Sequence, residues 1–345
     1  MKPSIFDSQK LSHWVSQNGL PAYRLGQIKQ WLFESRCQSF DQMTNLPANV
    51  RSELGEQFDF WSTSIAKHQS SDDGTEKLLV SLSGGGAVEC VLLRDGIRRT
   101  ICVSSQVGCA MGCVFCASGL DGVDRNLHSH EIVDQMVRLQ RLLPVDERLS
   151  HIVMMGMGEP LANIDNVLSA LDIASSPDGL GISPRRITIS TVGIPAAIKK
   201  LASSGSPYNL AISLHAPDDE LRNKLVPVNR KIGIESILAA ADGYFETTGR
   251  RLTFEYVLLA GINDQVDQAE KLIRLLKQRN ALLNVIPYNR VEGLPYKTPS
   301  AASIQSFRDV LLQGGINVKF RQRKGDEISA ACGQLRRTVP ITSVQ

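Results

Sequence analysis

The spacing of apolar side chains changes twice along the chain. In residues 1–62, apolar side chains such as Leu25, Ile28 and Leu32 recur at helical spacing, which predicts a small helical module. Residues 77–93 contain two apolar runs on either side of a glycine triplet, which predicts a β-hairpin. Farther along, short apolar runs alternate with amphipathic stretches. This alternation is typical of repeated βα units and a parallel sheet.

Six βα units are predicted in this last part of the chain. The predicted strands are residues 100–104, 151–155, 186–190, 209–215, 252–259 and 283–288. The predicted helices are residues 130–142, 164–174, 195–202, 234–245, 265–278 and 302–312. Because eight units close a full barrel, six predict an α/β fold with a partial (βα)6 barrel that is open on one side. We therefore expect a helical accessory module at 1–62, a β extension at 63–98 and the barrel at 99–345.

Polar or glycine-rich residues follow most of the predicted strands. They are Cys109, residues 156–159, Ser190, His215 and Asn289. In barrels of this kind the reactive groups lie at the C-terminal ends of the strands. We therefore expect these residues to surround a common site at that end of the sheet.

Three cysteines, Cys109, Cys113 and Cys116, share a C-x-x-x-C-x-x-C spacing within one loop-like stretch. Iron–sulfur cubanes are bound by cysteine thiolates, so three ligands leave one iron without a protein ligand. An open coordination position indicates reactivity rather than structure, as it does in catalytic zinc sites. The alternative is a structural zinc site completed by a distant cysteine, although the sequence has no paired C-x-x-C motifs to favour it.

The composition is that of an ordinary globular protein, with 42% hydrophobic and 21% charged residues. The N-terminus has no apolar leader, and no apolar run approaches the roughly 20 residues that span a bilayer. We expect a cytoplasmic protein without membrane contact, in which seven cysteines serve metals and catalysis rather than disulfides. The net charge of +3 does not demand a nucleic-acid partner. Basic pairs, either solvated or in contact with such a partner, occur at 98–99, 185–186, 230–231, 321–324 and 336–337.

Several longer strings resemble one known family. They are C-V-S-S-Q-V-G-C at 102–109, R-N-L at 125–127, M-G-M-G-E-P-L at 155–161, S-L-H-A at 213–216 and G-D-E-I-S-A-A-C-G-Q-L at 325–335. With the three cysteines, they make the chain similar to the radical S-adenosylmethionine enzymes and, more narrowly, to the RlmN/Cfr family of RNA adenine methyltransferases. The resemblance implies a 4Fe–4S cluster on Cys109, Cys113 and Cys116, with S-adenosylmethionine on the open iron.

The resemblance also implies roles for two further cysteines. An isolated cysteine such as Cys332 is usually a buried small hydrophobe, but by resemblance it is methylated by a first S-adenosylmethionine. A deoxyadenosyl radical made from a second one takes a hydrogen from that methyl group, and the carbon radical adds to the adenine ring. Cys102 is implied as the resolving thiol, which forms a transient disulfide with Cys332 and frees the product. Cys37 and Cys90 match no family residue.

The proton acceptor implied by the resemblance is Glu89. It lies in the apolar run 88–92, where an unpaired charge would be costly, and this favours a group that can hold a proton. The alternative is an exposed carboxylate on an edge strand.

The residues implied as contacts of S-adenosylmethionine offer hydrogen bonds to its ribose, adenine or amino-acid groups. They are Glu159, Pro160, Ser190, Ser213, Leu214, His215 and Asn289. The glycines at positions 156 and 158 would let the backbone approach this ligand closely.

The function expected from the resemblance is methylation of carbon 2 of an adenosine in 23S rRNA and of the adenosine next to the anticodon in tRNA. The base would have to leave its stack to reach the site, and the basic pairs and residues 1–62 would contact the RNA. We also expect an external one-electron donor such as flavodoxin, and a monomer. Three alternatives stay open: methylation at carbon 8, activation of a glycyl-radical protein, and a zinc- or cluster-stabilised RNA-binding protein in which Cys332 completes the ligand set.

Overall fold

Ten strands form one sheet that joins an antiparallel part to a parallel part. The structure is a computed structural model that describes residues 2–205, 208–321 and 324–336. The strand order is β1-β2-β3-β4-β7-β8-β9-β10-β11-β12. Strands β1 to β4 pair antiparallel, and each neighbouring pair from β4 to β12 is parallel. The bounds are β1 Thr63–Ser70, β2 Glu76–Leu82, β3 Ala87–Asp95, β4 Arg98–Cys102, β7 His151–Met154, β8 Ile187–Thr191, β9 Asn209–Ser213, β10 Leu252–Leu258, β11 Ala281–Pro287 and β12 Val318–Phe320.

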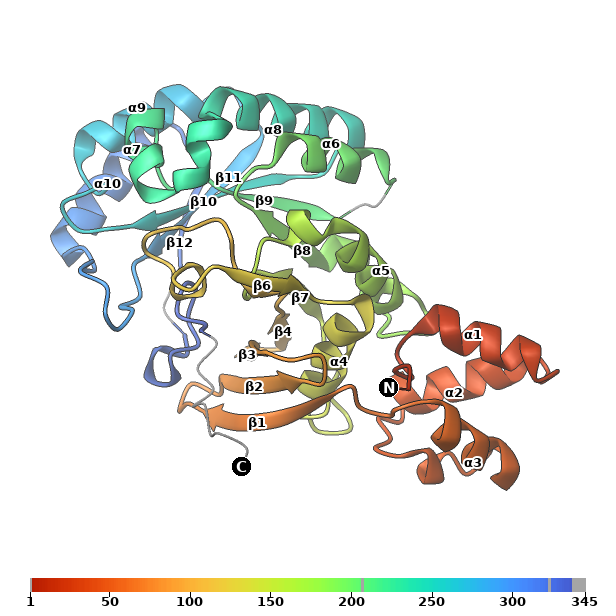
Figure 1. Cartoon of the computed structure of the whole chain (residues 1–345). Helices are drawn as coiled ribbons and strands as arrows, with labels where there is room; N and C mark the ends of the chain where they lie inside the picture. Colours follow the sequence, from red (N-terminus) through yellow and green to blue (C-terminus); the bar gives the residue numbers. More distant parts are fainter. Residues whose placement is uncertain (1, 206–207, 322–323, 337–345) are drawn as a thin grey trace.

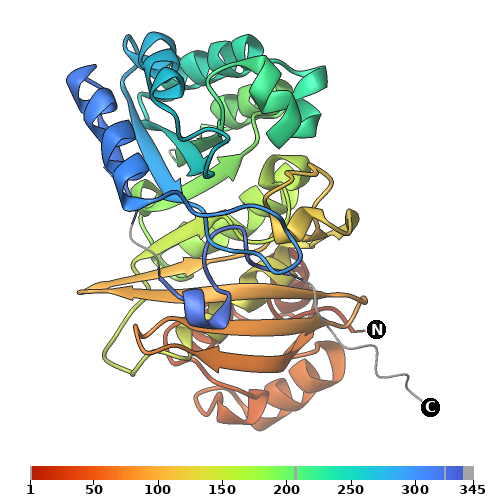
Figure 2. The ribbon, with the colours of Figure 1, turned by 90° about the vertical axis from the view of Figure 1, so that its left-hand side faces the viewer.

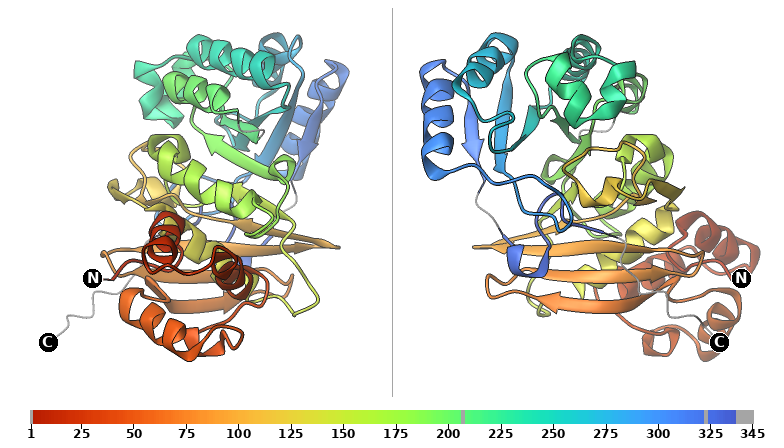
Figure 3. Two further views of the ribbon diagram at one scale, coloured as in Figure 1. Left: turned by 90° about the vertical axis from the view of Figure 1, so that its right-hand side faces the viewer. Right: turned by 60° about the vertical axis from the view of Figure 1, so that its left-hand side comes forward.

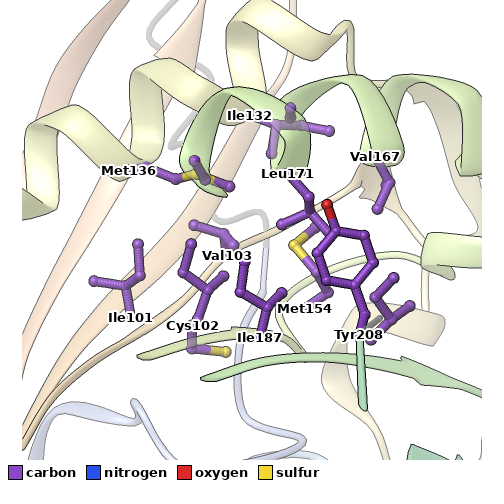
Figure 4. Packing of buried hydrophobic residues seen from close by; sticks show 14 of the residues in the cluster. Ile101, Cys102, Val103, Ile132, Met136, Met154, Val167, Leu171, Ile187 and Tyr208 are labelled. Carbon is purple, nitrogen blue, oxygen red and sulfur yellow. The ribbon is translucent and has the colours of Figure 1, made fainter. Parts of the chain in front are cut away.

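The helices of the parallel part lie along the outer side of the sheet (Figure 1). They are α4 Ser129–Gln140, α5 Ile164–Ser175, α6 Pro195–Ser203, α7 Asp219–Leu225, α8 Ile234–Thr248, α9 Val266–Leu276 and α10 Ala301–Gln313. Figure 4 shows how they bury the sheet: Met154 and Ile187 lie beneath Ile132 of α4 and Leu171 of α5. Burying such a side chain contributes about 1.5–3 kcal/mol, which is why the strands are apolar on this face.

The N-terminal residues form a compact group of helices next to α4 and α5 (Figures 1 and 3). These helices are α1 Ser8–Gln17, α2 Tyr23–Phe33 and α3 Ala48–Gln57. Arg138 of α4 joins this group to the sheet, because its guanidinium lies 4.1 Å from the centre of the Trp61 ring and donates to the Thr63 carbonyl at 2.7 Å. The three helices confirm the helical module that was predicted for residues 1–62.

Short elements connect the larger ones. A separate two-stranded sheet pairs β5 Gln106–Gly108 with β6 Val123–Asn126. The 3-10 helices are η1 Phe40–Gln42, η2 Ala117–Gly119, η3 Pro160–Asn163, η4 Pro184–Arg186, η5 Pro227–Lys231 and η6 Asp326–Ile328. No helix in the described ranges is long and apolar enough to cross a bilayer.

The predicted hairpin, the six barrel strands and their six helices are all present, so the α/β partial-barrel fold is confirmed. Strands β1, β5, β6 and β12 and helix α7 were not predicted. Strand β1 is almost entirely exposed and polar, and the other four have only three to seven residues, so none carries a clear apolar period. With β12 the parallel part gains a seventh strand. The division at 62 and 98 stays a prediction, since β1 to β3 continue the same sheet as the barrel strands.

Candidate active site

Strand register places Lys77, Glu89 and Cys102 on the inner face of the sheet, which is the face turned away from the helices. Lys77 lies opposite Val91, and Val91 lies opposite Cys102. Opposed residues share a face, as do alternate residues along one strand, so Glu89 lies on the same face as the other two. Figure 4 shows the Cys102 sulfur directed away from the helices, which agrees with this register.

Lys77 and Glu89 form a buried ion pair on that face. The Lys77 Nζ lies 2.8 Å from Glu89 Oε1, and each residue is only 5% exposed. Strand β3 lies inside the sheet, between β2 and β4. The expectation of an unpaired carboxylate is therefore wrong, because Lys77 supplies the counter-charge. The alternative of an exposed carboxylate on an edge strand is also wrong.

The segment that carries Cys332 lies across the same face (Figure 2). Lys77 Nζ donates to the Ser329 carbonyl at 3.1 Å, and Glu89 Oε2 accepts the backbone N–H of Arg336 at 2.8 Å. One ion pair thus holds the chain on both sides of Cys332, which is itself an exposed residue. Any movement of Cys332 is restrained by contacts with Glu89 and its partner.

Cys102 and Cys332 are close enough to influence each other. Burial, reinforced by the nearby Cys332 thiol, raises the pKa of Cys102 to about 12. Both are free thiols in the structure. Cys90 faces the opposite way from Glu89, into the core beneath α4, and Cys37 is buried among the N-terminal helices.

The loop with Cys109, Cys113 and Cys116 packs against the C-terminal segment. The Ala117 N–H donates to the Gly333 carbonyl at 2.8 Å, and Ser118 Oγ donates to the Leu335 carbonyl at 2.7 Å. Surrounding protein atoms desolvate the Cys332 thiol and raise its pKa even though part of the residue reaches solvent, and the nearby Cys116 raises it further. The two cysteine groups that the sequence analysis singled out are therefore neighbours.

The three thiols of this loop fit an iron–sulfur cluster. Burial raises the pKa of Cys113 well above its ordinary value, and Cys116 and Cys109 raise it further, so the thiols lie within electrostatic range of one another. In a cubane each cysteine binds a different iron, and this loop supplies three such thiols side by side.

The turn at residues 156–159 follows β7, as predicted, and its glycines lie close to another part of the chain. A Cβ on Gly156 would lie 2.6 Å from Ser104 Oγ, and a Cβ on Gly158, whose φ is +99°, would lie 2.7 Å from the Gln106 amide nitrogen. They allow a close approach to the chain after β4, and an approach to a ligand stays a prediction. The approach to the chain after β4 places Glu159 deep beside the cysteine loop.

Glu159 is a buried carboxyl with two backbone partners. It accepts the N–H of Leu161 at 3.0 Å and that of Val192 at 2.9 Å. Burial raises its pKa to about 7. Pro160 follows it as the buried first residue of η3.

His215 faces the cysteine loop. Its ring lies 4.8 Å from that of Phe115, edge to face, and its Nδ1 accepts the Val257 N–H at 3.0 Å. Nδ1 therefore carries no proton, and Nε2 holds the hydrogen of the neutral ring. Burial, with Arg222, lowers its pKa to about 3. A φ of +58° is uncommon for a residue other than glycine, and it indicates a backbone fixed by its surroundings.

The other predicted cofactor contacts also reach this region. Ser190 and Ser213 are half-buried near the ends of β8 and β9. Asn289 donates to the Cys332 carbonyl at 3.2 Å, while its own Oδ1 is buried without a hydrogen-bond partner in the described part of the chain. Such an orphaned acceptor suits a ligand that brings a donor. Leu214 differs, because its side chain is in the core and its N–H and carbonyl bind Glu255 and Arg222.

Glu255 is a further candidate that the sequence analysis missed. It lies opposite Ser213 on the inner face and accepts a 2.6 Å hydrogen bond from Asn284. Burial raises its pKa to about 7, and it is close enough to Cys332 to act on that thiol. A single carboxyl within an apolar strand, the signal used for Glu89, is present here as well.

The predicted basic pairs are not all near the site. Arg98 and Arg99 begin β4, while Arg185 and Arg186 precede β8, so these pairs lie at the opposite ends of the strands. These two pairs therefore lie at the N-terminal ends of their strands, away from the candidate site, and their contact with RNA stays a prediction. Arg99 is also bound by Glu147 at 2.8 Å.

The remaining basic pairs lie nearer the site, because they come after the C-terminal ends of α7 and β12. Arg230 and Lys231 are exposed in η5, and Arg321 directly follows β12. Lys324 binds the Asp95 carboxylate at 3.1 Å. Two members of the predicted pairs, Arg323 and Arg337, lie outside the described residues.

Two family models match the chain. Residues 103–276 match the model described as "Radical SAM superfamily". Residues 5–59 match the model described as "Ribosomal RNA large subunit methyltransferase N-terminal domain". Together these matches include most of the helical module and the greater part of the barrel.

Curated relatives and a solved structure resemble the whole chain. A Rhodopirellula baltica protein named "Probable dual-specificity RNA methyltransferase RlmN" is 66% identical over 95% of this chain and 88% of its own length. A Bacillus licheniformis protein of the same name is 44% identical over 97% of this chain and 94% of its own. The crystal structure of a radical SAM methyltransferase from Sphaerobacter thermophilus matches with a TM-score of 0.94 and 40% identity, covering 97% of this chain and 100% of that one.

Proposed function

The chain belongs to the RlmN family of radical S-adenosylmethionine RNA methyltransferases, and on this premise we propose that it methylates carbon 2 of adenosines in 23S rRNA and in tRNA next to the anticodon. As a member of this family it uses a 4Fe–4S cluster and S-adenosylmethionine. One observation supports the proposal most directly. The segment that carries Cys332 is hydrogen-bonded both to the cysteine loop, through Ala117 and Gly333, and to Glu89, through the backbone of Arg336.

The cofactors would be held by groups that the structure leaves available for them. Cys109, Cys113 and Cys116 would bind the cluster. Glu159, Pro160, Ser190, Ser213, His215 and Asn289 would surround S-adenosylmethionine, whereas Leu214 has no free polar group to offer it. When bound, the cluster and this cofactor supply the one-electron chemistry that activates an otherwise inert methyl group.

Cys332 would carry the methyl group that is transferred to the base. After the carbon–carbon bond has formed, the ring carbon must lose its hydrogen and the radical adduct must lose one electron. Glu89 would accept the hydrogen as a proton, and the oxidised cluster would be the acceptor of the electron. The Cys102 thiolate would then attack the sulfur of Cys332. A sulfur–sulfur bond forms, the carbon–sulfur bond breaks, and its electron pair stays on the carbon, which takes up a proton to become the new methyl group.

The resolving step needs a deprotonated Cys102 before it and a reductant after it. The raised pKa of Cys102 means that its thiol is protonated at neutral pH, so it must give up a proton before it can attack. The disulfide must be reduced by an external dithiol before another cycle.

We also propose an external one-electron donor such as flavodoxin, a monomer and a cytoplasmic location. RNA contacts would come from residues 1–62 and from the exposed basic residues Arg230, Lys231 and Arg321.

Anaerobic reconstitution followed by nucleoside mass spectrometry tests the proposal. The purified protein is supplied with iron, sulfide, a reductant and S-adenosylmethionine, and then with a 23S rRNA fragment or a tRNA transcript. We expect 2-methyladenosine from both RNAs. If 8-methyladenosine is the main product, the carbon 2 assignment is wrong. Anaerobically purified protein that holds zinc and no iron would exclude the cluster assignment.

A further inference from the structure

Arg222 is a buried cation whose hydrogen-bond partners are all uncharged. It lies in α7 and is 0% exposed. Its guanidinium donates to the carbonyls of Leu214 at 2.9 Å, Val192 at 2.6 Å and Ser213 at 2.8 Å, and also to the Asn229 side-chain oxygen. Neutral oxygens satisfy its donors but do not balance its charge.

Helix α7 is attached to the cysteine loop. The N–H of Val114, next to Cys113, donates to the carbonyl of Leu225 in α7 at 3.1 Å. The charge of Arg222 and the thiol of Cys113 also act on each other. The acid that acts on Arg222 is Asp219, which is exposed and therefore screened by water.

A buried charge without a counter-charge costs several kcal/mol. Among the residues that the structure describes, no buried acid is paired with Arg222, so its charge calls for a further anion. A cluster bound by thiolates on Cys109, Cys113 and Cys116 would be such an anion. Its negative charge increases when it accepts an electron, so a fixed cation nearby stabilises the reduced form more than the oxidised form.

We infer that Arg222 is the counter-charge of the iron–sulfur cluster and that it makes the cluster easier to reduce. This inference rests on the cluster site proposed above. The external donor supplies the electron, and Arg222 neither binds nor releases a proton in the process. Since the hydrogen bonds of Arg222 also join the ends of β8 and β9, its charge has to be separated from its structural role.

Three variants separate the two roles. Arg222→Met removes both the charge and the hydrogen bonds, whereas Arg222→Lys keeps the charge and loses most of the bonds. Asp219→Asn removes the opposing charge and keeps an oxygen that can accept the N–H of Ile234, which Asp219 binds at 2.9 Å. Each reconstituted variant is analysed for iron and sulfide and titrated at controlled potential, with the reduced cluster followed by electron paramagnetic resonance.

For Arg222→Met we expect the equilibrium constant for reduction to fall about tenfold, equivalent to about 59 mV for one electron. Arg222→Lys should stay within about twofold of the wild-type constant, and Asp219→Asn should shift it in the opposite direction, by about twofold. A structural role alone would lower the iron content and would not distinguish Arg222→Lys from Arg222→Met.

Each outcome bears on a different statement. An unchanged potential in iron-loaded Arg222→Met overturns the inference, and so does an equal shift in Arg222→Met and Arg222→Lys. If Arg222→Met does not fold, an unchanged potential in iron-loaded Arg222→Gln, which keeps hydrogen-bond donors without the charge, overturns it instead. Wild-type protein that takes up no iron contradicts the proposed cluster site itself.

Discussion

Lys77 and Glu89 lie on neighbouring strands, two positions out of register, and their charged atoms are 2.8 Å apart on the inner face of the sheet. The same two side chains bind the backbone on both sides of Cys332. The proposed proton acceptor is therefore fixed by the same contacts that place the proposed methyl carrier. This arrangement makes the pair accessible to experiments on stability and on catalysis.

We predict that Lys77→Met destabilises the protein more than the double variant Lys77→Met/Glu89→Gln does. Removal of one partner leaves a buried charge alone and costs about 3–5 kcal/mol. The double variant buries two neutral groups and should recover much of that loss. Urea unfolding of the wild type, both single variants and the double variant gives the coupling energy. If the effects of the two single substitutions simply add, Lys77 and Glu89 are not a coupled pair.

We predict that Glu89→Gln stops the reaction after the RNA has become joined to the protein. Gln still accepts a hydrogen bond but cannot take the proton from the ring carbon, so product formation should fall about 100-fold or more. A covalent RNA–protein species should accumulate on denaturing gels, with Cys332 as the attached residue in peptide mass spectrometry.

Glu246→Gln is a suitable control for this experiment because Glu246 is an exposed residue of α8, and it should turn over like the wild type. A Glu89→Gln protein that releases methylated RNA at the wild-type rate would show that another group accepts the proton.

We predict that Cys102→Ala also traps RNA on Cys332, because nothing is left to attack its sulfur. The matched control is Cys90→Ala. Cys90 is buried in the adjacent strand, but its side chain faces the core instead of the inner face. It should give free methylated RNA at close to the wild-type level. If Cys102→Ala yields only free RNA on denaturing gels, or if Cys90→Ala traps as much RNA as Cys102→Ala, the assignment of the resolving thiol is wrong.

The sequence predicted those parts of the fold that depend on local periodicity. The six barrel strands bury one full face against helices, so their apolar runs are unmistakable, and the residues that follow them had to meet at one end of the sheet. Strands β1 and β12 bury too little surface to leave such a pattern. They are positioned by pairing with β2 and β11, which do bury apolar side chains.

The sequence indicated which residue types form the site, but it did not indicate which of them contact one another. The role of Lys77 could not be seen, because its approach to Glu89 depends on the register between two strands. The cost of an unpaired Glu89 was judged correctly, but the protein avoids that cost with a counter-charge. Glu255 was missed although it carried the same signal as Glu89, a carboxyl in an apolar strand, because no motif of the family drew attention to it.

We predict that Glu255→Gln alters the pH dependence of stability. Burial raises the pKa of Glu255 from 4.5 to about 7, against the opposing effects of Asn284 and Arg321. Between these values the native state holds a proton that the unfolded state has lost, so its stability falls as the pH rises through this window and the loss is complete above it. A shift of this size corresponds to about 3 kcal/mol. Gln resembles the protonated carboxyl and should avoid the loss.

The measurement is urea unfolding of wild type and Glu255→Gln at several pH values from 4.5 to 8. The stability of the variant relative to the wild type should increase steadily across this range, whereas the exposed control Glu246→Gln should show no such trend. A difference between Glu255→Gln and wild type that is constant with pH would mean that Glu255 ionises in the native state much as it does in the unfolded chain. Its contact with Asn284, rather than its burial, would then dominate its electrostatic environment.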